Sequence, residues 1–441
     1  MSGLAVGSLM FAAMLALMAV RVPIAIAMFV PGALGYVFLA GEAAWLSHLK
    51  GAAFARLNVY ELSVIPLFLL TGQFAIHGGL SRSLFRLAAA LVGHFRGGLA
   101  MAAILASAGF GAICGSSVAT AATVTHVAFP EMRRHGYSGR LATATLAVGG
   151  TMGIQLPPSV ILIIYAIMTE QNIAKLFAAA LVPAAIAVTA YLVTIAVIVR
   201  RRPDEGPAQP RVSPAGLVAT LQDVWPVAVI FVLVFGGIYG GIFTPTEGAG
   251  IGAALTFVAG FVKRELTAAG IRESFLGAAT GSGMIFMIFL GADMLNSALS
   301  LSQMPSQLAD AVTHLGMPPL LIVVAILLMY ILLGAVMDEL SMVLLTIPVL
   351  FPAVMGLDLF GLNATEKAIW FGILVLGVVQ IGLVAPPVGL NVYVVNGVAR
   401  DVPMAETYRG VLPFLVSDVL RVTLLIFFPA LSLWLVRVLV P

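Results

Sequence analysis

The chain has few charged residues, and this scarcity excludes most classes of soluble protein. Asp, Glu, Lys and Arg together make up 9% of the 441 residues, whereas soluble globular domains carry about 25%. Hydrophobic residues make up 61%, and apolar runs close to the ~20 residues that a spanning helix needs recur along the whole length. The sequence therefore predicts an all-α polytopic membrane protein, with a single membrane domain over residues 1–441.

Other absences narrow the function further. Cys114 is the single cysteine, which rules out an intrachain disulfide and a metal cluster built on cysteines. The chain contains no Walker A motif, so we do not expect it to hydrolyse ATP. The first apolar run has no basic segment before it and Arg21 after it, the reverse of a secretory signal peptide. We therefore expect this run to be retained as the first span.

Lys and Arg are unevenly distributed, and their distribution predicts the orientation of the chain. Short cytoplasmic loops are enriched in these two residues. If Met1 lies outside, most of the 22 Lys and Arg residues fall on the cytoplasmic side, and Arg421 falls inside a span. The basic residues left on the outer side are Lys50, Arg56, Lys175, Lys367 and Arg437.

The apolar stretch between Arg96 and Arg133 does not fit a simple span. Basic residues flank it on both sides, so both of its ends are expected in the cytoplasm, and its middle carries a polar break at 115–117. Non-helical backbone is tolerated at membrane depth only where it is buried in protein or lines a cavity. A re-entrant helical hairpin with its tip at this break satisfies both conditions. The alternative is one long tilted helix whose small residues pack against a neighbour.

A second apolar stretch has the same form, with one arm on each side of a break at Gly334 to Glu339. Its flanks have the opposite character, because Ser300 to Gly316 carries no Lys or Arg, and Lys367 is the one basic residue between Pro352 and the next apolar run. Both ends are therefore expected outside. The two hairpins are predicted to enter the membrane from opposite faces.

Several landmarks recur in the same order in the two halves of the chain. Each hairpin ends in a Phe-Pro pair, and each is followed by a span interrupted by two prolines, Pro157-Pro158 and Pro386-Pro387. The sequence therefore predicts two inverted repeats, 1–203 and 217–441, joined by a cytoplasmic linker at 204–216. We expect about ten spans plus the two hairpins.

Inverted repeats with proline-broken spans indicate a transporter's binding site near the middle of the membrane. Two adjacent prolines unwind a helix, and the freed carbonyls can coordinate a hard cation such as Na⁺. Taken singly, each pair could mark a mere kink, but we expect one sodium site on each repeat. The first set of ligands is Gly115, Ser116, Ser117, Gly150, Gly153 and Leu156. The second set is Gly334, Asp338, Ser341, Gly382, Val384 and Ala385. The expected substrate contacts are Ser117, Thr120, Pro157, Pro158, Pro387 and Asn391.

Four titratable residues inside the apolar stretches need an explanation. A carboxylate at membrane depth must be neutralised, paired or bound to a cation, and Asp338 has no Lys or Arg in its hairpin, so we expect it to bind the cation. Two interpretations of Glu339 stay open, a site ligand or a side chain that points to water. Asp418 and Arg421 are spaced to pair on one helix face. His126 is expected to pack rather than to carry protons.

The chain resembles the large membrane subunit, the DctM type, of tripartite ATP-independent periplasmic (TRAP) transporters. The resemblance covers nearly the whole chain through GSSVATAATV, PEMRRHGY, GIQLPPSVILIIY, GIYGGIFTPTEGAG, LTIPVLFPAV and IGLVAPPVGLNVYVV. It implies a sodium-coupled importer in a bacterial cytoplasmic (inner) membrane, not an enzyme, that works by an elevator motion. The implied substrate is an organic acid anion, such as a C4-dicarboxylate, sialic acid or another sugar or keto acid.

The resemblance also implies partners. A soluble periplasmic binding protein would deliver the substrate, and a small four-helix membrane subunit would accompany this chain in the lipid bilayer. Because Met1 leads directly into the large-subunit pattern, we expect the small subunit to be a separate chain. No nucleic acid is expected as a partner. Cys114 stands where the family more often has Ser or Gly, and we do not expect its side chain to be a ligand.

Two alternatives stay open at this point. A stand-alone carboxylate or anion symporter of related hairpin fold would need no binding protein. An intramembrane protease would use Ser116 or Ser117 with His126 as nucleophile and base, or Asp293 with Asp338 as an aspartyl pair. Neither protease arrangement explains the inverted repeat or the two Pro-Pro breaks.

Overall fold

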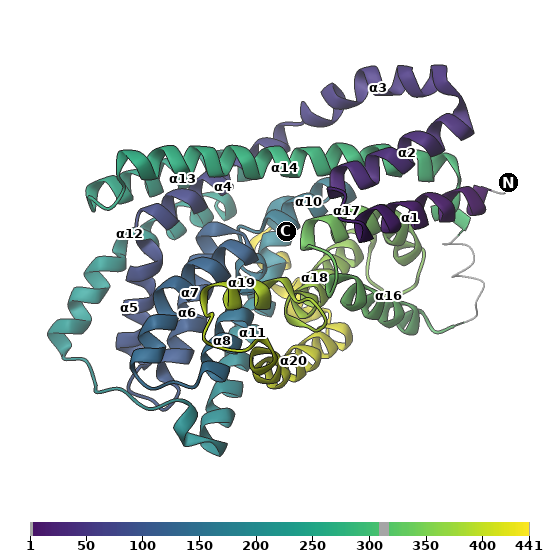
Figure 1. Cartoon of the computed structure of the whole chain (residues 1–441). Helices are drawn as coiled ribbons and strands as arrows, with labels where there is room; N and C mark the ends of the chain where they lie inside the picture. The colour runs from purple at the N-terminus through teal and green to yellow at the C-terminus, as the bar shows by residue number, and fades with distance from the viewer. Residues whose placement is uncertain (1–2, 308–316, 441) are drawn as a thin grey trace.

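The computed structural model describes residues 3–307 and 317–440, and the regular elements assigned within these ranges are helices (Figure 1). Six of them are long and apolar enough to cross a membrane, and a bent pair of helices over 42–77 is a seventh candidate. This confirms the predicted all-α membrane architecture. The total approaches the expected ten spans only when the shorter apolar helices α1 (Gly3–Ala19) and α2 (Ile24–Ala40) are included.

One group of helices is arranged along the long helix α14 (Ala268–Leu301), which crosses the top of Figure 1. Helices α2 and α4 (Val64–His77) pack along α14, and α13 (Pro245–Val262) packs along α4. Helix α12 (Pro214–Tyr239) joins α13 to α5 (Leu80–Val92). We call α1 to α4 and α12 to α14 the scaffold group.

Helix α3 (Glu42–Leu57) is an exposed arm of the scaffold group, and none of its residues is buried. An ion pair of 2.6 Å between Arg56 Nε and Asp293 Oδ1 joins this helix to α14. Asp293 is buried. Because its carboxylate pairs with Arg56 on the arm, Asp293 does not form the pair with Asp338 that an aspartyl protease would require.

The first predicted hairpin is present as α6 (Gly98–Cys114) and α7 (Ser117–Arg134), with Gly115 in the left-handed region at φ +68° between them. Leu99 N at the start of α6 donates to the Tyr137 hydroxyl beyond α7, at 3.0 Å. Burial raises the pKa of Tyr137 to about 12, so this hydroxyl stays neutral. Because the two ends of the stretch lie side by side, the single tilted helix is wrong.

The linker beneath this hairpin contacts both of its ends. Gly97 N, before α6, donates to Gly206 O, and Ser138 N, after α7, donates to Glu205 O. The segment leading from α11 (Ile173–Arg201) to α12 therefore lies on the same side as both ends of the hairpin. The repeat boundaries at residues 203 and 217 stay a prediction.

The second hairpin consists of α16 (Pro319–Gly334) and α17 (Glu339–Met355). A hydrogen bond between the hydroxyls of Tyr330 and Thr346 joins its arms. Part of the flank without Lys or Arg that predicts its orientation, residues 308–316, lies outside the described residues.

Both proline-broken spans are interrupted where the sequence predicts. The first comprises α8 (Gly139–Gly150), α9 (Met152–Gln155) and α10 (Val160–Thr169). The second comprises α18 (Ala364–Val384) and α19 (Leu390–Val398), and both Pro-Pro peptide bonds are cis.

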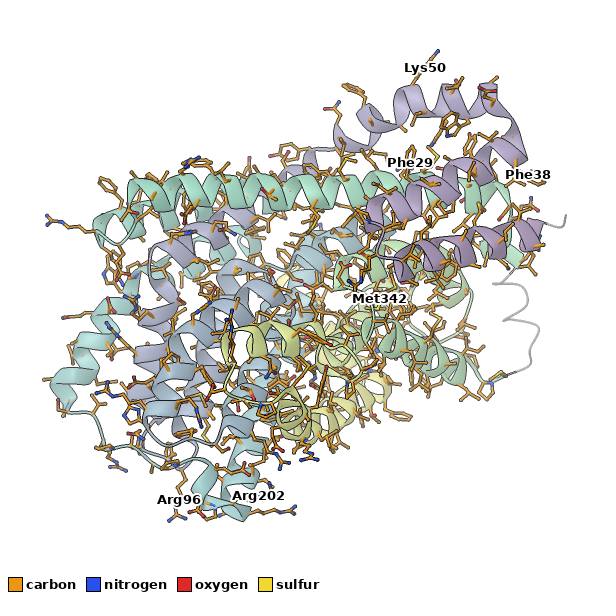
Figure 2. All side chains as sticks on the ribbon, in the orientation of Figure 1. Phe29, Phe38, Lys50, Arg96, Arg202 and Met342 are labelled. Carbon is orange, nitrogen blue, oxygen red and sulfur yellow. The ribbon has the colours of Figure 1, made fainter. Side chains whose placement is uncertain are left out.

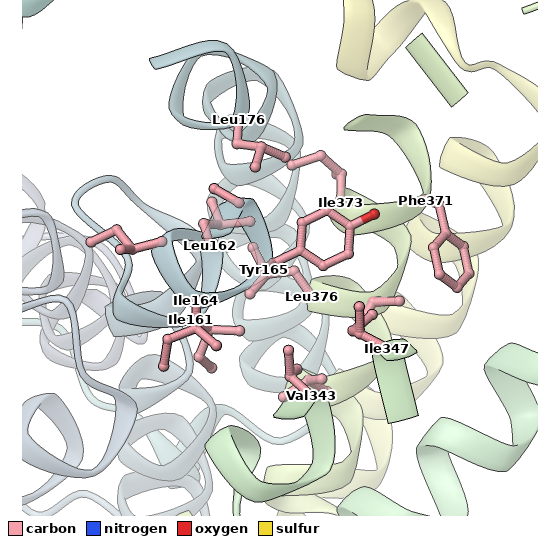
Figure 3. Packing of buried hydrophobic residues seen from close by; sticks show 14 of the residues in the cluster. Ile161, Leu162, Ile164, Tyr165, Leu176, Val343, Ile347, Phe371, Ile373 and Leu376 are labelled. Atoms are coloured by element: carbon pink, nitrogen blue, oxygen red, sulfur yellow. The ribbon is translucent and has the colours of Figure 1, made fainter. Parts of the chain in front are cut away.

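The core interlocks the two halves of the chain. Arm α7 of the first hairpin packs against α19 of the second half, and arm α17 of the second hairpin packs against α10 of the first. Figure 3 shows Ile161 and Leu162 of α10 near Val343 of α17 and Ile373 of α18. Helix α20 (Met404–Phe427) packs against α8, α11 and α18, and α21 (Ala430–Leu439) packs against α11. The hairpins, the broken spans, α11 and α20 form what we call the core group.

Ion pairs at the ends of the helices join residues that the charge distribution assigns to the same side. Arg133 pairs with Asp401 at 3.1 Å on the predicted cytoplasmic side, and Lys263 pairs with Asp223 at 2.8 Å. On the predicted outer side, Arg437 pairs with Glu366 at 2.6 Å. Figure 2 shows Arg96 and Arg202 at the opposite end of the molecule from Lys50. These positions agree with the predicted orientation of the loops.

Candidate functional site

The tip of the first hairpin lies against the break in the first broken span. A Cβ atom on Gly153 would lie 2.3 Å from Ser116 O and 2.5 Å from Thr120 Oγ1, and one on Gly115 would lie 2.5 Å from Pro158 O. Only glycine permits these approaches of backbone to backbone. Thr120 is fully buried, and its hydroxyl has only a weak contact with the Cys114 thiol. A carbonyl oxygen and an underused hydroxyl thus converge there, which suits a hard cation.

The remaining residues expected at the first sodium site are distributed differently. Gly150 faces the second arm of the hairpin, where its Cβ would lie 2.5 Å from Ala121 Cβ, and 2.9 Å from Asn391 Nδ2. Leu156 is extended and half-buried at the break. The oxygen cluster is therefore built mainly by Ser116, Thr120 and the close approach of Gly153.

The expected substrate contacts do not form one surface. Pro157 and Pro158 are buried, whereas Pro387 is exposed. Asn391 is buried on α19 and donates to Ala147 O of α8 at 3.3 Å, while its own carbonyl oxygen has no hydrogen-bond partner among the described residues. Asn391 therefore links the second half to the first broken span.

The tip of the second hairpin repeats the close approach of the first. A Cβ on Gly382 would lie 2.7 Å from the backbone of Gly334, and Gly111 and Gly153 approach equally closely in the first half. Val384 and Ala385 lie against Gly389. Of the second expected set, Gly334 and Gly382 are thus brought together, as are Asp338 and Ser341.

Asp338 has a role in its own helix that the sequence reasoning missed. Its Oδ2 accepts from Leu340 N and Ser341 N, both at 3.1 Å, and its Oδ1 accepts from the Ser341 hydroxyl. The side chain is half-buried and is the N-cap of α17, as Ser116 is the N-cap of α7. An N-cap carboxylate is stabilised by the backbone amides and the helix dipole. Asp338 therefore has partners without a bound cation, contrary to the argument from its missing basic neighbour.

Glu339 reaches the other hairpin. It is 8% exposed, and its two carboxylate oxygens lie 2.8 and 2.7 Å from the Ser117 hydroxyl, which donates to them. Ser117 is fully buried. The interpretation in which Glu339 points to water is wrong. The internal repeat could have predicted this contact. Ser117 and Glu339 occupy corresponding positions, because each directly follows the N-cap residue at the tip of its hairpin.

A cavity of about 540 Å³ lies against both tips. Ser116, Asp338 and Glu339 border it on the core side, and Gln73 of α4 and Met284 of α14 border it on the scaffold side. Among the described residues that line it, none is Lys, Arg or His. Sequence reasoning missed the contribution of α4 and α14, because nothing in either helix marks the register that faces the tips.

Three other cavities lined by described residues are larger, of about 840, 670 and 630 Å³, but none of the three contacts both tips. One of about 840 Å³ lies between α11 and α20 and has a mainly apolar lining. Another of about 670 Å³ adjoins the second tip, where Arg21 and Asp338 both border it. Size therefore does not identify the candidate site. Of these cavities, the one of about 540 Å³ is lined by residues of both hairpin tips.

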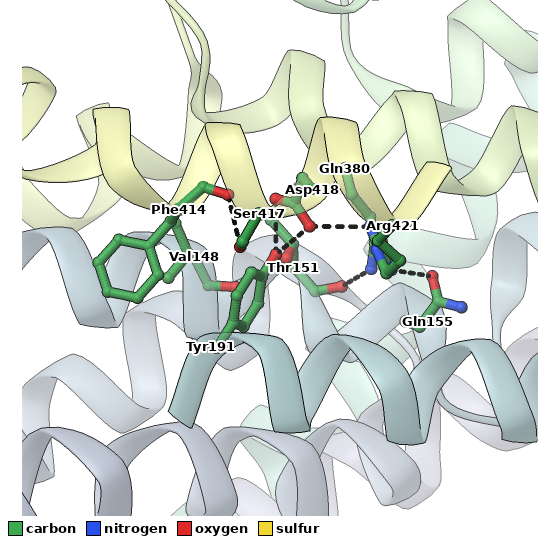
Figure 4. Close-up of polar contacts among 9 residues, drawn as sticks. All are labelled: Val148, Thr151, Gln155, Tyr191, Gln380, Phe414, Ser417, Asp418 and Arg421. Carbon is green, nitrogen blue, oxygen red and sulfur yellow. Dashed lines mark hydrogen bonds and ion pairs between the residues drawn. The ribbon is translucent and has the colours of Figure 1, made fainter. Parts of the chain in front are cut away.

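A buried polar network joins both broken spans to α11 and α20 (Figure 4). The predicted pair is present, with Arg421 Nη2 3.0 Å from Asp418 Oδ1 and both side chains 1% exposed. Tyr191 of α11 donates to Asp418 at 2.8 Å, and Arg421 donates to Gln380 of α18 at 2.7 Å. Gln380 in turn donates to Thr151 O, at the junction of α8 and α9, at 2.9 Å. The network therefore ties the two halves of the core group together.

His126 is exposed, so its interpretation as a packing histidine is wrong. Ser117 bonds to Glu339 and not to a histidine base, which leaves the serine protease arrangement unformed. Within the part of the chain that the structure describes, no three His, Cys, Asp or Glu side chains gather in a way that would hold a metal ion. The tips instead offer oxygen ligands, from backbone carbonyls, hydroxyl groups and the carboxylates of Asp338 and Glu339.

The family model and the curated relatives agree on one family. The family described as "Tripartite ATP-independent periplasmic transporter, DctM component" matches residues 11–431. The C4-dicarboxylate TRAP transporter large permease protein DctM of Pseudomonas aeruginosa is 35% identical, over 85% of this chain and 86% of that protein. The isethionate TRAP transporter permease protein DctMQ of Oleidesulfovibrio alaskensis is 30% identical, over 94% of this chain and 64% of that protein. The crystal structure of the Alcanivorax borkumensis YdaH transporter has a similar fold, with a TM-score of 0.64 and 14% identity over 88% of this chain and 89% of that one.

Proposed function

Because this chain belongs to the DctM component family of tripartite ATP-independent periplasmic transporters, we propose that it carries an organic acid anion inward across a bacterial cytoplasmic membrane, coupled to sodium. The family consists of multi-pass membrane transporters and not of enzymes, which excludes the intramembrane protease. The anions named for its relatives, a C4-dicarboxylate and isethionate, define the substrate class only as organic acids.

The single observation that carries this proposal is the meeting of the two hairpin tips at one cavity. Hairpins predicted to enter from opposite faces come together through Ser117 and Glu339 beside that cavity. Such a meeting point between inverted repeats is where secondary transporters bind substrate and coupling ion. The cavity lies within the range of about 300–1,000 Å³ that small-molecule sites occupy.

Sodium coupling is supported by the oxygen groups at the tips. Ser116 O and Thr120 Oγ1 converge at Gly153, and we assign the first sodium ion to this cluster. The second ion is assigned to the carboxylate of Asp338, near the close approach of Gly334 and Gly382. Sodium there would add to the amide contacts that already hold this carboxylate.

The proposed motion is an elevator in which the core group moves against the scaffold group. The buried network from Tyr191 to Gln380 supports movement of the core as one body, because it joins both broken spans. The cavity lies where the two groups meet, with Gln73 and Met284 on the scaffold side and the tips on the core side. A sliding movement at this boundary would carry the tips and the substrate together.

We further propose two protein partners. A soluble periplasmic binding protein delivers the substrate, and a small four-helix membrane subunit, encoded as a separate chain, binds the scaffold group. A relative whose printed name is DctMQ, longer than this chain, supports a second membrane component. The experiment is uptake into proteoliposomes that contain the full chain and its membrane partner, with and without the binding protein, under either a sodium or a proton gradient alone.

Uptake is expected only with the sodium gradient and the binding protein. Undiminished uptake under the proton gradient alone would contradict sodium coupling. Equal uptake without the binding protein would favour the stand-alone symporter instead.

A further inference from the structure

We propose that the cavity between the hairpin tips selects a substrate with one carboxylate on a mainly apolar body, and that it discriminates against dicarboxylates and sugar acids. This inference rests on the proposed function, which places the substrate in that cavity. Two properties of the lining carry it, its charge and its shortage of hydrogen-bonding groups.

The charge at the cavity is negative, and its favourable positions for an anion are already used. Asp338 and Glu339 border the cavity, and no Lys, Arg or His stands among the described residues of the lining. Helices α7 and α17 both begin there, and a helix N-terminus offers about half a positive charge. Asp338 accepts the first amides of α17, and the Ser117 hydroxyl at the start of α7 donates to Glu339.

The number of substrate charges that fit follows from this balance. Two sodium ions, one on each repeat as proposed, and the two helix N-termini together supply about three positive charges. The carboxylates of Asp338 and Glu339 balance two of these charges, which leaves a net charge of about one for a substrate carboxylate to balance. A second substrate carboxylate would enter a site of low dielectric without a partner, and burying an unpaired charge is strongly unfavourable. Arg21 is not among the residues that line this cavity; it borders the adjoining one, which Asp338 also borders.

The rest of the lining is apolar and suits a hydrocarbon body. Its side chains include Ile24, Leu69, Val160, Ile161, Met284 and Ile285. Besides the two carboxyl groups, Gln73 and Ser116 are the polar side chains in the described lining. Each substrate hydroxyl that is buried without a partner costs free energy, so a polyhydroxylated acid would bind poorly.

Three acids, each with five carbons, distinguish the effect of a second carboxylate from the effect of hydroxyl groups. 3-Methylbutanoate has one carboxylate and an apolar body, glutarate has two carboxylates, and ribonate has one carboxylate and several hydroxyls. Binding of each to the purified full chain is measured by ligand-dependent thermal stabilisation, in sodium chloride and in choline chloride. The binding protein is left out, so that the membrane cavity alone selects. We expect 3-methylbutanoate to bind at least ten-fold more tightly than the other two, and only in sodium.

Sodium-dependent binding of glutarate or ribonate as tight as that of 3-methylbutanoate would overturn the inference and leave the proposed function standing. No sodium-dependent binding of any of the three acids would also overturn the inference, and the uptake experiment with the binding protein would then decide the proposed function separately.

The variant Glu339→Gln tests the charge argument directly. It keeps an acceptor for the Ser117 hydroxyl and removes one negative charge, so the preference for 3-methylbutanoate over glutarate should fall at least five-fold. Glu366→Gln is the matched control, because Glu366 pairs with Arg437 at the predicted outer surface and should leave the preference unchanged. An unchanged preference in Glu339→Gln would also overturn the inference.

Discussion

The Ser117 hydroxyl donates a hydrogen bond to the Glu339 carboxylate, whose oxygens lie 2.8 and 2.7 Å away, and this contact joins the tips of the two hairpins. Ser117 is the first residue of α7 and Glu339 is the first residue of α17. The two residues therefore occupy corresponding positions in the inverted repeats. A bond between such positions fixes the relative placement of hairpins that belong to different halves of the chain.

We expect Ser117→Ala to lower both stability and uptake. The change leaves a buried carboxyl group without its donor, a loss that costs about 1–3 kcal/mol. Ser117→Thr keeps a hydroxyl and should restore most of the loss. The measurements are the melting temperature and the initial uptake rate at equal expression. Wild-type values for both in Ser117→Ala would show that the contact between the tips contributes nothing.

Two substitutions of Asp338 are predicted to separate its role as a helix cap from its role in cation binding. Asn is as good an N-cap as Asp, so Asp338→Asn should keep the hairpin folded but raise the sodium concentration for half-maximal uptake. Asp338→Ala should in addition lose about 1 kcal/mol of stability, the usual cost of a lost cap. Ser138→Ala removes the cap of α8 and controls for capping alone. If sodium dependence is unchanged in Asp338→Asn, the second ion does not bind there.

Features set by neighbouring residues are predictable from this sequence, and contacts between the halves are not. The hairpin breaks, the proline-broken spans and the Asp418–Arg421 pair each depend on residues a few positions apart, where glycine, proline and charge have local meaning. The bonds from Ser117 to Glu339 and from Arg421 to Gln380 depend on how helices pack. Hydrophobicity in a membrane span does not reveal which face meets which neighbour.

The sequence places Asp338 correctly at the hairpin tip, but it does not reveal that Asp338 caps a helix there. Its place at the tip follows from the sequence, but its hydrogen bonds to Leu340 N and Ser341 N depend on the helix beginning at Glu339. The choice between Asp338 and Glu339 for the more deeply buried carboxylate also depends on that start. If the helix began one residue earlier, Asp338 would take the first helical position that Glu339 now occupies.

Gly153→Ala is predicted to prevent the close approach of the first tip to its broken span. The added Cβ would lie 2.3 Å from the Ser116 carbonyl oxygen, and overpacking of this kind costs about 1–3 kcal/mol. Because the Ser116 carbonyl belongs to the proposed sodium cluster, uptake should also fall and need more sodium. Gly283→Ala on α14 is the control, since nothing lies within 4 Å of its Cβ. Equal behaviour of the two variants would contradict the tight approach.

Cysteine labelling is expected to confirm that both hairpins are re-entrant. In a Cys114→Ser background, single cysteines at Arg96 and Arg133 should react only from the cytoplasm. Cysteines at Gln303 and Asp358 should react only from outside, and all four positions are exposed. The readout is modification by a membrane-impermeant maleimide in intact cells and in inverted vesicles. A split within either pair would turn that hairpin into a span.

Replacing only one residue of the Asp418–Arg421 pair is predicted to lower stability more than replacing both residues. Asp418→Asn or Arg421→Met leaves one charge buried without its partner, which costs about 3–5 kcal/mol, whereas the double variant Asp418→Leu with Arg421→Met leaves neither. Double-variant protein should therefore be more stable than either single variant. Glu406→Gln is the surface control, because its pair with Arg409 is exposed and such pairs contribute about 0–1 kcal/mol. The measurement is thermal unfolding in detergent, followed by uptake. If the double variant is stable but transports slowly, the network is needed to move both broken spans together, and if it transports at the wild-type rate, the proposed rigid core does not depend on this pair.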